Sequence, residues 1–335
     1  MADDVRMTLL SKAVFHKAAW ISCLLLVLIL AGIGPALANT ALVLRAPGDD
    51  FSEVVNGMSD DLEGDIGFAE LVVDAGSRVS DVAAQIKTHQ PKVIVLIGNS
   101  SVNLYTKYQQ AFPGQEFPPS IALAALFVDK FIPFLKNATG IRYEIPLVTS
   151  VVNMRLLMEK PIKKVGVVYR SWMQDIFDEN VAYCRAEGIE LIGGKLPNKD
   201  RNMNRKIKQQ LQGLINQGVD VIWLLNDNQL INQKALKKVW LPLITRSKLP
   251  VIVGIKSLLA TKLNLGSFAI VPDHYGLGVQ ASSVLLEIME NDWKILEQNI
   301  EHPLSVKQIV NVTILNKRSI QYRENLLSQV DDVIN

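Results

Sequence analysis

Short β-branched runs alternate with helical patterns along almost the whole of this chain. The runs span residues 41–44, 71–74, 93–97, 165–169, 219–225 and 251–255. Most lead into a polar stretch and then into a segment with apolar residues at helical spacing. Parallel strands need long crossover connections, which are usually helices. The alternation therefore predicts an α/β fold in which helices cover both faces of parallel sheets.

The clearest helical patterns lie in residues 274–291 and 146–160, where apolar residues recur every three or four positions. A change of lobe is expected at Asn137-Ala138-Thr139-Gly140, because a strand-like segment at 141–143 starts a new βα series there. The Pro- and Gly-rich residues 112–119 fall inside a lobe. We interpret the Asn137 segment as a hinge crossing.

The first 38 residues have the pattern of an export signal. A leader with three basic residues runs into an uncharged apolar stretch that ends in Ala36-Leu37-Ala38, the small-x-small pattern that a signal peptidase cuts. The pattern predicts cleavage after Ala38, a chain that begins at Asn39, and a periplasmic location.

A retained membrane anchor is the alternative, because the 21 uncharged residues from Ala18 to Ala38 are just long enough to span a bilayer. Gly32, Gly34 and Pro35 interrupt the second half of this stretch, which favours cleavage and no stable anchor afterwards.

The composition after Ala38 excludes some partners. It has 32 basic and 31 acidic residues, so it offers no electrostatic reason to expect nucleic acid or an anionic membrane. Cys184 is its single cysteine and cannot form an internal disulfide. The remaining 297 residues, in a chain that is 49% hydrophobic, are enough for two domains.

Motifs for catalysis and for cofactors are missing. The sequence has no glycine-rich dinucleotide fingerprint, no phosphate-binding loop and no Gly-x-Ser-x-Gly elbow. His89, His274 and His302 lack the spacing of metal ligands. We therefore expect no catalytic residues, no metal and no cofactor.

Polar residues follow the predicted strands, and in open α/β sheets ligands bind beyond the carboxyl ends of the strands. The candidate ligand-binding residues are Phe51, Asn99, Ser100, Ser101, Arg170, Trp172, Asp227, Asn228, Lys256 and Asp273. This edge of the sheets is expected to hold a small polar solute.

Several segments also match, in order and spacing, those of a known family. Asn137-Ala138-Thr139-Gly140-Ile141 is similar to its Asn-x-Thr-Gly-Val hinge, and Leu225-Asn226-Asp227-Asn228 to its Pro-Asp-Asn turn. Pro272-Asp273-His274-Tyr275-Gly276-Leu277-Gly278 is similar to its Asp-Tyr-x-x-x-Gly helix start, and residues 310–313 and 330–334 to its terminal strand and helix. The chain thus resembles the ABC-transporter substrate-binding proteins of the type I periplasmic fold, in the group that includes aromatic amino acid binders.

The resemblance implies two Rossmann-like lobes with parallel sheets, joined by a three-crossing hinge. One lobe is expected from residues 39–140 and 268–303, and the other from 141–267 and 304–335. Two departures concern the ligand. The family's proline before the Asp-Asn turn is Leu225 or Asn226 here, and its Asn-Pro after the 165–169 strand is replaced by Arg170-Ser171-Trp172.

Each candidate residue has a ligand role and a structural alternative. The start of a helix near Asn99, with the hydroxyls of Ser100 and Ser101, suits a carboxylate, and Asp227 suits an ammonium. Trp172 or Phe51 offers an apolar or cation–π surface. This combination describes an amino-acid-like ligand.

The structural alternatives are of three kinds. Asn99, Ser100, Asn228 and Asp273 precede helices and fit N-capping. Asp227 fits an ion pair with a nearby lysine, and Trp172 fits packing under a loop. Arg170 is either a solvated charge or the partner of a carboxylate.

Three functional classes remain open. The first is a receptor that delivers a small solute to an inner-membrane ABC permease by hinge closure. The second is a periplasmic sensory protein that signals to a membrane kinase or cyclase. The third is a two-lobed α/β enzyme such as a glycosyltransferase, which needs a catalytic carboxylate or a nucleotide site.

Overall fold

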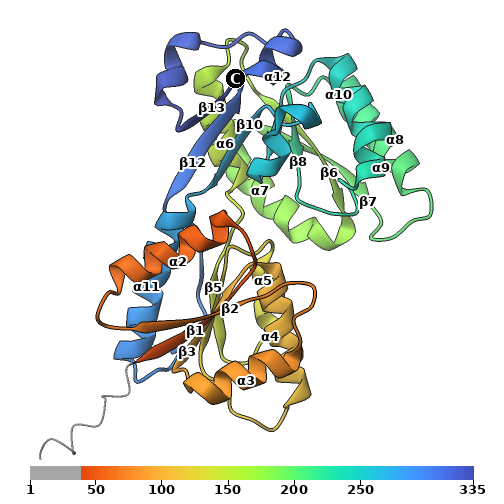
Figure 1. Ribbon diagram of the computed structural model, residues 1–335. Coiled ribbons are helices and arrows are strands. Elements are labelled where there is room, and N and C mark those ends of the chain that lie inside the picture. Colours follow the sequence, from red (N-terminus) through yellow and green to blue (C-terminus); the bar gives the residue numbers. More distant parts are fainter. Residues whose placement is uncertain (1–38) are drawn as a thin grey trace, which may run out of the picture.

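The protein has two lobes, each built on its own sheet (Figure 1). The structure is a computed structural model, and it describes residues 39–335. The expected signal peptide, residues 1–38, lies outside the described residues.

The first lobe contains a six-stranded sheet in the order β11-β5-β4-β3-β1-β2, and all of its strand pairs are parallel. The strands are β1 (Thr40–Arg45), β2 (Gly67–Val72), β3 (Val93–Ile97), β4 (Ser120–Leu123), β5 (Ala138–Ile141) and β11 (Ile300–Glu301). The helices are α2 (Asp49–Asp61), α3 (Val79–His89), α4 (Asn99–Ala111), α5 (Val128–Phe131), the 3₁₀ turn η1 (Ile132–Phe134) and α11 (His274–Glu290).

Both faces of this sheet are covered, as the continuous apolar runs predict. Along β1, Ala41 and Val43 belong to the apolar cluster under α2 and α11. Leu42 and Leu44 point to the opposite face and pack with side chains of α3 and α4. The two-residue period of a strand thus gives each helix pair its own core.

The second lobe contains a seven-stranded sheet in the order β13-β12-β10-β9-β8-β6-β7, in which only the β10–β12 pair is antiparallel. Its strands are β6 (Lys164–Arg170), β7 (Glu190–Leu196), β8 (Val221–Leu224), β9 (Val251–Val253), β10 (Phe268–Pro272), β12 (Val306–Asn311) and β13 (Asp332–Ile334).

Its α- and π-helices are α6 (Leu147–Leu157), α7 (Gln174–Ala186), α8 (Met203–Asn216), α9 (Gln233–Ala235), the π-helix η3 (Leu236–Trp240), α10 (Leu241–Ser247) and α12 (Val312–Lys317). Its 3₁₀ segments are η2 (Ser171–Met173), η4 (Lys256–Leu259), η5 (Thr261–Leu263) and η6 (Glu324–Gln329).

The chain passes between the two sheets three times: after β5, between β10 and α11, and after β11. The second passage differs from the expected position before Phe268. β10 pairs with β9 and β12 of the seven-stranded sheet, so residues 268–272 lie in the second lobe. The lobes change at Asp273, where α11 leaves to pack on α2 (Figure 1).

The contact between α2 and α11 depends on two glycines. A Cβ at Gly57 would lie 2.2 Å from the backbone oxygen of Tyr275, and a Cβ at Gly278 would lie 2.2 Å from that of Val54. The helices therefore approach at a distance that only glycine allows at these positions. This contact fixes α11, the first element after the second crossing, onto the first lobe.

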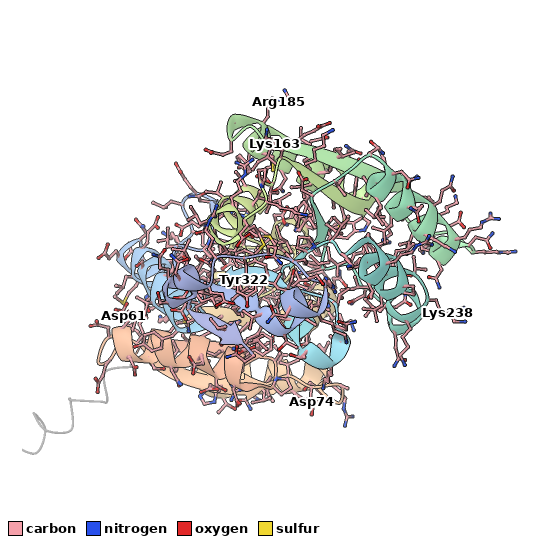
Figure 2. The ribbon with its side chains drawn as sticks, turned by 90° about the horizontal axis from the view of Figure 1, so that it is seen from above. Asp61, Asp74, Lys163, Arg185, Lys238 and Tyr322 are labelled. Atoms are coloured by element: carbon pink, nitrogen blue, oxygen red, sulfur yellow. The ribbon has the colours of Figure 1, made fainter. Side chains whose placement is uncertain are left out.

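The strand expected at 71–74 was misplaced, since β2 spans Gly67–Val72. β2 is an edge strand of half-exposed residues. Its pairing with β1 begins at Gly67, so tertiary context rather than local apolarity sets its start. The exposed surface carries charges of both signs, among them Asp61, Asp74, Lys163, Arg185 and Lys238, which Figure 2 labels.

Candidate ligand-binding cleft

A cleft lies between the lobes, and segments that follow strands of both sheets form much of its wall. It has two adjoining compartments that share Phe127 of the first lobe and Asn226 of the second. The rim compartment is lined by Asn99, Asn103, Leu126, Phe127, Phe131, Arg170, Trp172, Asn226, Asp227, Asn228 and Gln229.

The hinge compartment reaches the first and third crossings. About 740 Å³ of space lies between and in front of its walls, open solvent included. Its polar lining residues include Asp129, Arg142, Glu144, Ser150, Glu179, Asn180, Asn226 and His302, and Phe127, Tyr183 and Trp223 are its aromatic ones.

The rim compartment brings together five of the candidates named from the sequence: Asn99, Arg170, Trp172, Asp227 and Asn228. They come from the ends of β3, β6 and β8. The strand-end rule therefore predicted correctly that these side chains lie close together. That they bind a solute stays a prediction.

Asp227 has a different partner from either expectation. Arg170 donates from Nε to Oδ2 at 2.6 Å and from Nη2 to Oδ1 at 2.8 Å. The backbone N–H of Gln229 also donates to Oδ1, at 2.9 Å. The carboxylate is 1% exposed and its charge is neutralised by a two-point pair. Asp227 is therefore not a free receptor for an ammonium group, and its partner is an arginine rather than a lysine.

Helix α4 begins at Asn99 as predicted, but the serines after it do not act alike. Ser101 is fully buried and its hydroxyl donates to the Ile97 carbonyl at 2.9 Å, so it faces the core, not the cleft. Ser100 is exposed and lines neither compartment. The N-cap position is Gly98, and no side chain caps this end of α4.

Asn99 holds a loop in place instead of capping its helix. Its Nδ2 donates to the Leu126 carbonyl and its Oδ1 accepts from the Leu126 N–H, both at 2.9 Å. The two bonds position the segment that carries Phe127. Asn99 thus shapes the wall of the rim compartment through contacts within the protein.

Trp172 and Phe127 meet across the cleft, one from each lobe. Their rings lie edge to face with centroids 5.1 Å apart. The Arg170 guanidinium lies 5.6 Å from the centre of the Trp172 ring. Among residues 39–335, no partner is present for the buried Trp172 Nε1. Trp172 is accordingly part of the cleft wall.

Besides Ser100 and Ser101, three more candidates lie outside both compartments. Phe51 packs near Gly98 at the start of α4 and joins the core of the first lobe. Lys256 is exposed and forms a 2.9 Å ion pair with Asp332. Asp273 precedes α11 without capping it and pairs with Lys307 at 2.7 Å.

Sequence reasoning missed the hinge compartment. Arg142 and Glu144 directly follow β5, which was interpreted only as a hinge. The strand-end rule, applied to β5, would have found both residues. Phe127 follows β4, a four-residue strand with no clear alternation, so no local signal distinguished it. Trp223 of β8 belongs to the core of the second lobe and also lines the compartment.

Glu144 is an acid of the hinge compartment whose pKa is raised by its surroundings. Its Oε1 accepts a hydrogen bond from the Phe127 N–H at 2.9 Å. Burial raises the pKa of its carboxyl to about 7, against a smaller opposing effect of this hydrogen bond. Its neighbour Arg142 is engaged elsewhere, because Nη1 donates to both oxygens of Glu179 at 3.1 Å.

Other buried polar atoms of the hinge compartment have no partner within the described part of the chain: Asn226 Oδ1, Arg142 Nε and His302 Nδ1. Asn226 is 8% exposed, and its amide lies against Gly254, where a Cβ would be 2.7 Å away. Burial lowers the pKa of His302 below its ordinary value. An unpartnered buried polar atom is costly, so a group that satisfies these three would bind favourably.

Two further findings concern the described residues as a whole. Over residues 39–335, no cluster of three or more His, Cys, Asp or Glu side chains is arranged to hold a metal ion. Within the same residues, no helix combines the length and apolarity that crossing a membrane requires.

The sequence profile of a family described as "ABC transporter substrate binding protein" matches residues 49–334. The chain belongs to this family. Its two lobes and interlobe cleft are those of the type I periplasmic binding proteins. No curated protein matches the sequence of this substrate-binding family member significantly.

Solved structures share its fold at low sequence identity. An ABC domain in complex with L-Trp from Streptococcus pneumonia is 18% identical, with a TM-score of 0.56, over 88% of this chain and 99% of that one. A ligand-free, open substrate binding protein with adhesive properties from Clostridium difficile is 15% identical, with a TM-score of 0.61, over 89% of this chain and 99% of that one. A conserved domain protein from Vibrio cholerae is 16% identical, with a TM-score of 0.54, over 88% and 99%.

Proposed function

We propose that this substrate-binding protein is the periplasmic receptor of an ABC importer. Its lobes close on a small, amino-acid-like solute in the cleft, and the closed form delivers the solute to an inner-membrane permease. It performs no chemistry on the solute and needs no cofactor.

The observation that carries this proposal is a group of unsatisfied polar atoms around one interlobe cleft. Trp172 Nε1, Asn226 Oδ1, Arg142 Nε and His302 Nδ1 are buried and have no partner among residues 39–335. Trp172 and Asn226 belong to the second lobe, and Arg142 and His302 directly follow β5 and β11 of the first lobe at the crossings. Each would cost about 1–3 kcal/mol if left unpaired, so a solute that bonds them gains affinity from both lobes at once.

Contacts between the lobes give closure a physical basis. Besides the Phe127–Trp172 ring contact, Lys130 of α5 forms an ion pair with Asp175 of α7. Arg142, beside the first crossing, pairs with Glu179 of α7. A solute that bridges the same two surfaces would favour the closed arrangement over an open one.

A thermal-shift screen of the purified protein against amino acids, small amines, purines and sugars tests this function. A solute present at 100 times its dissociation constant stabilises the protein by about 2.7 kcal/mol. We expect amino acids or close analogues to raise the melting temperature. If no solute of any class does so, the receptor function is wrong.

The transport role has its own test. Deleting the gene should abolish high-affinity uptake of the solute that the screen finds. Unchanged uptake together with a lost transcriptional or kinase response would favour the sensory alternative. Intact mass spectrometry of exported protein should give a chain that begins at Asn39.

A further inference from the structure

The hinge compartment contains one acid that is not neutralised by a partner. In the described residues, Glu144 forms no ion pair, and its one side-chain hydrogen bond comes from the Phe127 N–H. Asp227, the acid that sequence reasoning selected, is held by Arg170 at 2.6 and 2.8 Å. The negative charge available to a solute therefore lies at the hinge and not at the rim.

The charges around Glu144 add to this asymmetry. Asp129 of α5, Glu179 of α7, Arg142 beside the first crossing and His302 beside the third line the same compartment. Arg142 is shared with Glu179, and burial favours the neutral form of His302. Asp129 lies 3.6 Å from the Lys130 ammonium, so within the described part of the chain Glu144 is the acid of this lining without an ion-pair partner. With three acids and one arginine in its lining, the compartment has a negative balance.

A second observation points to a ligand that donates hydrogen bonds. Asn226 is 8% exposed and lines both compartments, and its Oδ1 has no partner within residues 39–335. This oxygen can only accept. Three aromatic side chains in the same wall, Phe127, Tyr183 and Trp223, can contact a cation through their ring faces.

We propose that Glu144, with Asn226, binds a positively charged nitrogen of the solute in the hinge compartment. The solute class is therefore a small molecule with an ammonium or amidinium group, and a carboxylate alone is insufficient. This inference rests on the proposed receptor function, since it assigns the charge of the solute and the residue that binds it.

Matched ligands separate the two charged ends of an amino acid. L-Tryptophan carries both charges, tryptamine carries only the ammonium, and indole-3-propionate carries only the carboxylate, all on the same ring system. Two more series have the same order of amino acid, amine and acid: phenylalanine, phenethylamine and hydrocinnamate, and leucine, isoamylamine and isocaproate. We expect binding in calorimetry from amines or amino acids, and at least tenfold weaker binding from the acid that lacks the ammonium.

Glu144→Gln keeps the acceptor for the Phe127 N–H and removes the charge. The dissociation constant of an amine-bearing ligand should rise by about 10- to 100-fold, the range for losing a charge-assisted hydrogen bond. Glu190→Gln is the matched control. Glu190 is the first residue of β7, at the end of the sheet away from the cleft, and it pairs with Lys164 at the surface. It should leave binding unchanged.

The wild-type protein offers a second readout that does not depend on a variant. A cation that needs ionised Glu144 should bind up to about tenfold more weakly for each pH unit from 7 to 5. Asp129, Arg142, Glu179 and His302 also line this compartment. The variant identifies the group responsible: Glu144→Gln should show a flatter dependence between pH 7 and 5 than wild type.

Equal affinity of Glu144→Gln and wild type for amines would overturn the inference, as would binding of only anionic or neutral solutes, including ribose and adenine. In either case the receptor function stands. If no compound of any class binds the wild type, the receptor function itself fails.

Discussion

Arg170 and Asp227 join the ends of β6 and β8 with two hydrogen bonds, of 2.6 and 2.8 Å, in a wall of the cleft. The carboxylate is 1% exposed and the arginine side chain 14%. Arg170 Nη1 also donates to the Asn198 carbonyl at 2.7 Å, which ties the end of β7 to the same point. The pair therefore braces one wall of the cleft.

Asp227→Asn should destabilise the unliganded protein by about 3 kcal/mol, because it leaves the Arg170 charge poorly compensated in a partly buried site. Urea denaturation followed by circular dichroism measures this free energy of unfolding. Asp332→Asn is the control, since its pair with Lys256 is exposed and such pairs contribute at most about 1 kcal/mol. If the two variants are equally stable, the buried pair is not a structural brace.

Glu144 should make stability depend on pH in a defined direction. Burial raises the pKa of its carboxyl from 4.5 to about 7 in the folded protein, so the folded state binds this proton more tightly than the unfolded state does. The stabilisation is fully present below pH 4.5 and is lost as pH rises through 7.

Glu144→Gln, which cannot ionise, should therefore raise the melting temperature relative to wild type at pH 8 and change it little at pH 4.5. Thermal melts of both proteins across this range provide the check. A constant difference at all pH values would mean that Glu144 titrates normally.

Gly278→Ala should destabilise the protein by about 1–3 kcal/mol, because its Cβ would lie 2.2 Å from the Val54 carbonyl oxygen and force α2 and α11 apart. Gly213→Ala in α8 is a matched control with no atom within 4 Å of its Cβ. There, alanine should stabilise by about 0.5–1 kcal/mol through helix propensity. Chemical denaturation of the two variants compares them directly, and similar stabilities would contradict the close helix contact.

Cys184 should be unreactive in the native protein. It is fully buried on α7, and burial raises the pKa of its thiol to about 11. A thiol reagent applied to protein that begins at Asn39 should label nothing until denaturant is added, and one thiol afterwards. Rapid labelling in native buffer would show that α7 opens easily.

The sequence predicted the architecture of this protein well, because buried parallel strands have a local signature. β3 was predicted to the residue, and α11 to within one residue of its end. The β10 assignment failed for a physical reason. Its side chains are buried in the second lobe, but it adjoins α11 of the first, and no local property says which sheet a buried strand joins.

The site was only partly predictable. Strand ends gave Arg170 and Asp227, but their partnership depends on β6 and β8 being neighbours in the sheet. Ser101 was predicted to face the cleft, and this was wrong. It lies one residue beyond Ser100 on α4, and its hydroxyl donates to the Ile97 carbonyl. The importance of Glu144 comes from burial between lobes, a property that only the assembled fold supplies.

Small-angle X-ray scattering of the protein with and without a saturating solute tests the central claim most directly. Closure of two lobes around a solute predicts a smaller radius of gyration and a narrower distance distribution in the bound state. A solute that binds stoichiometrically while both quantities stay unchanged would contradict the claim that the lobes close on their ligand.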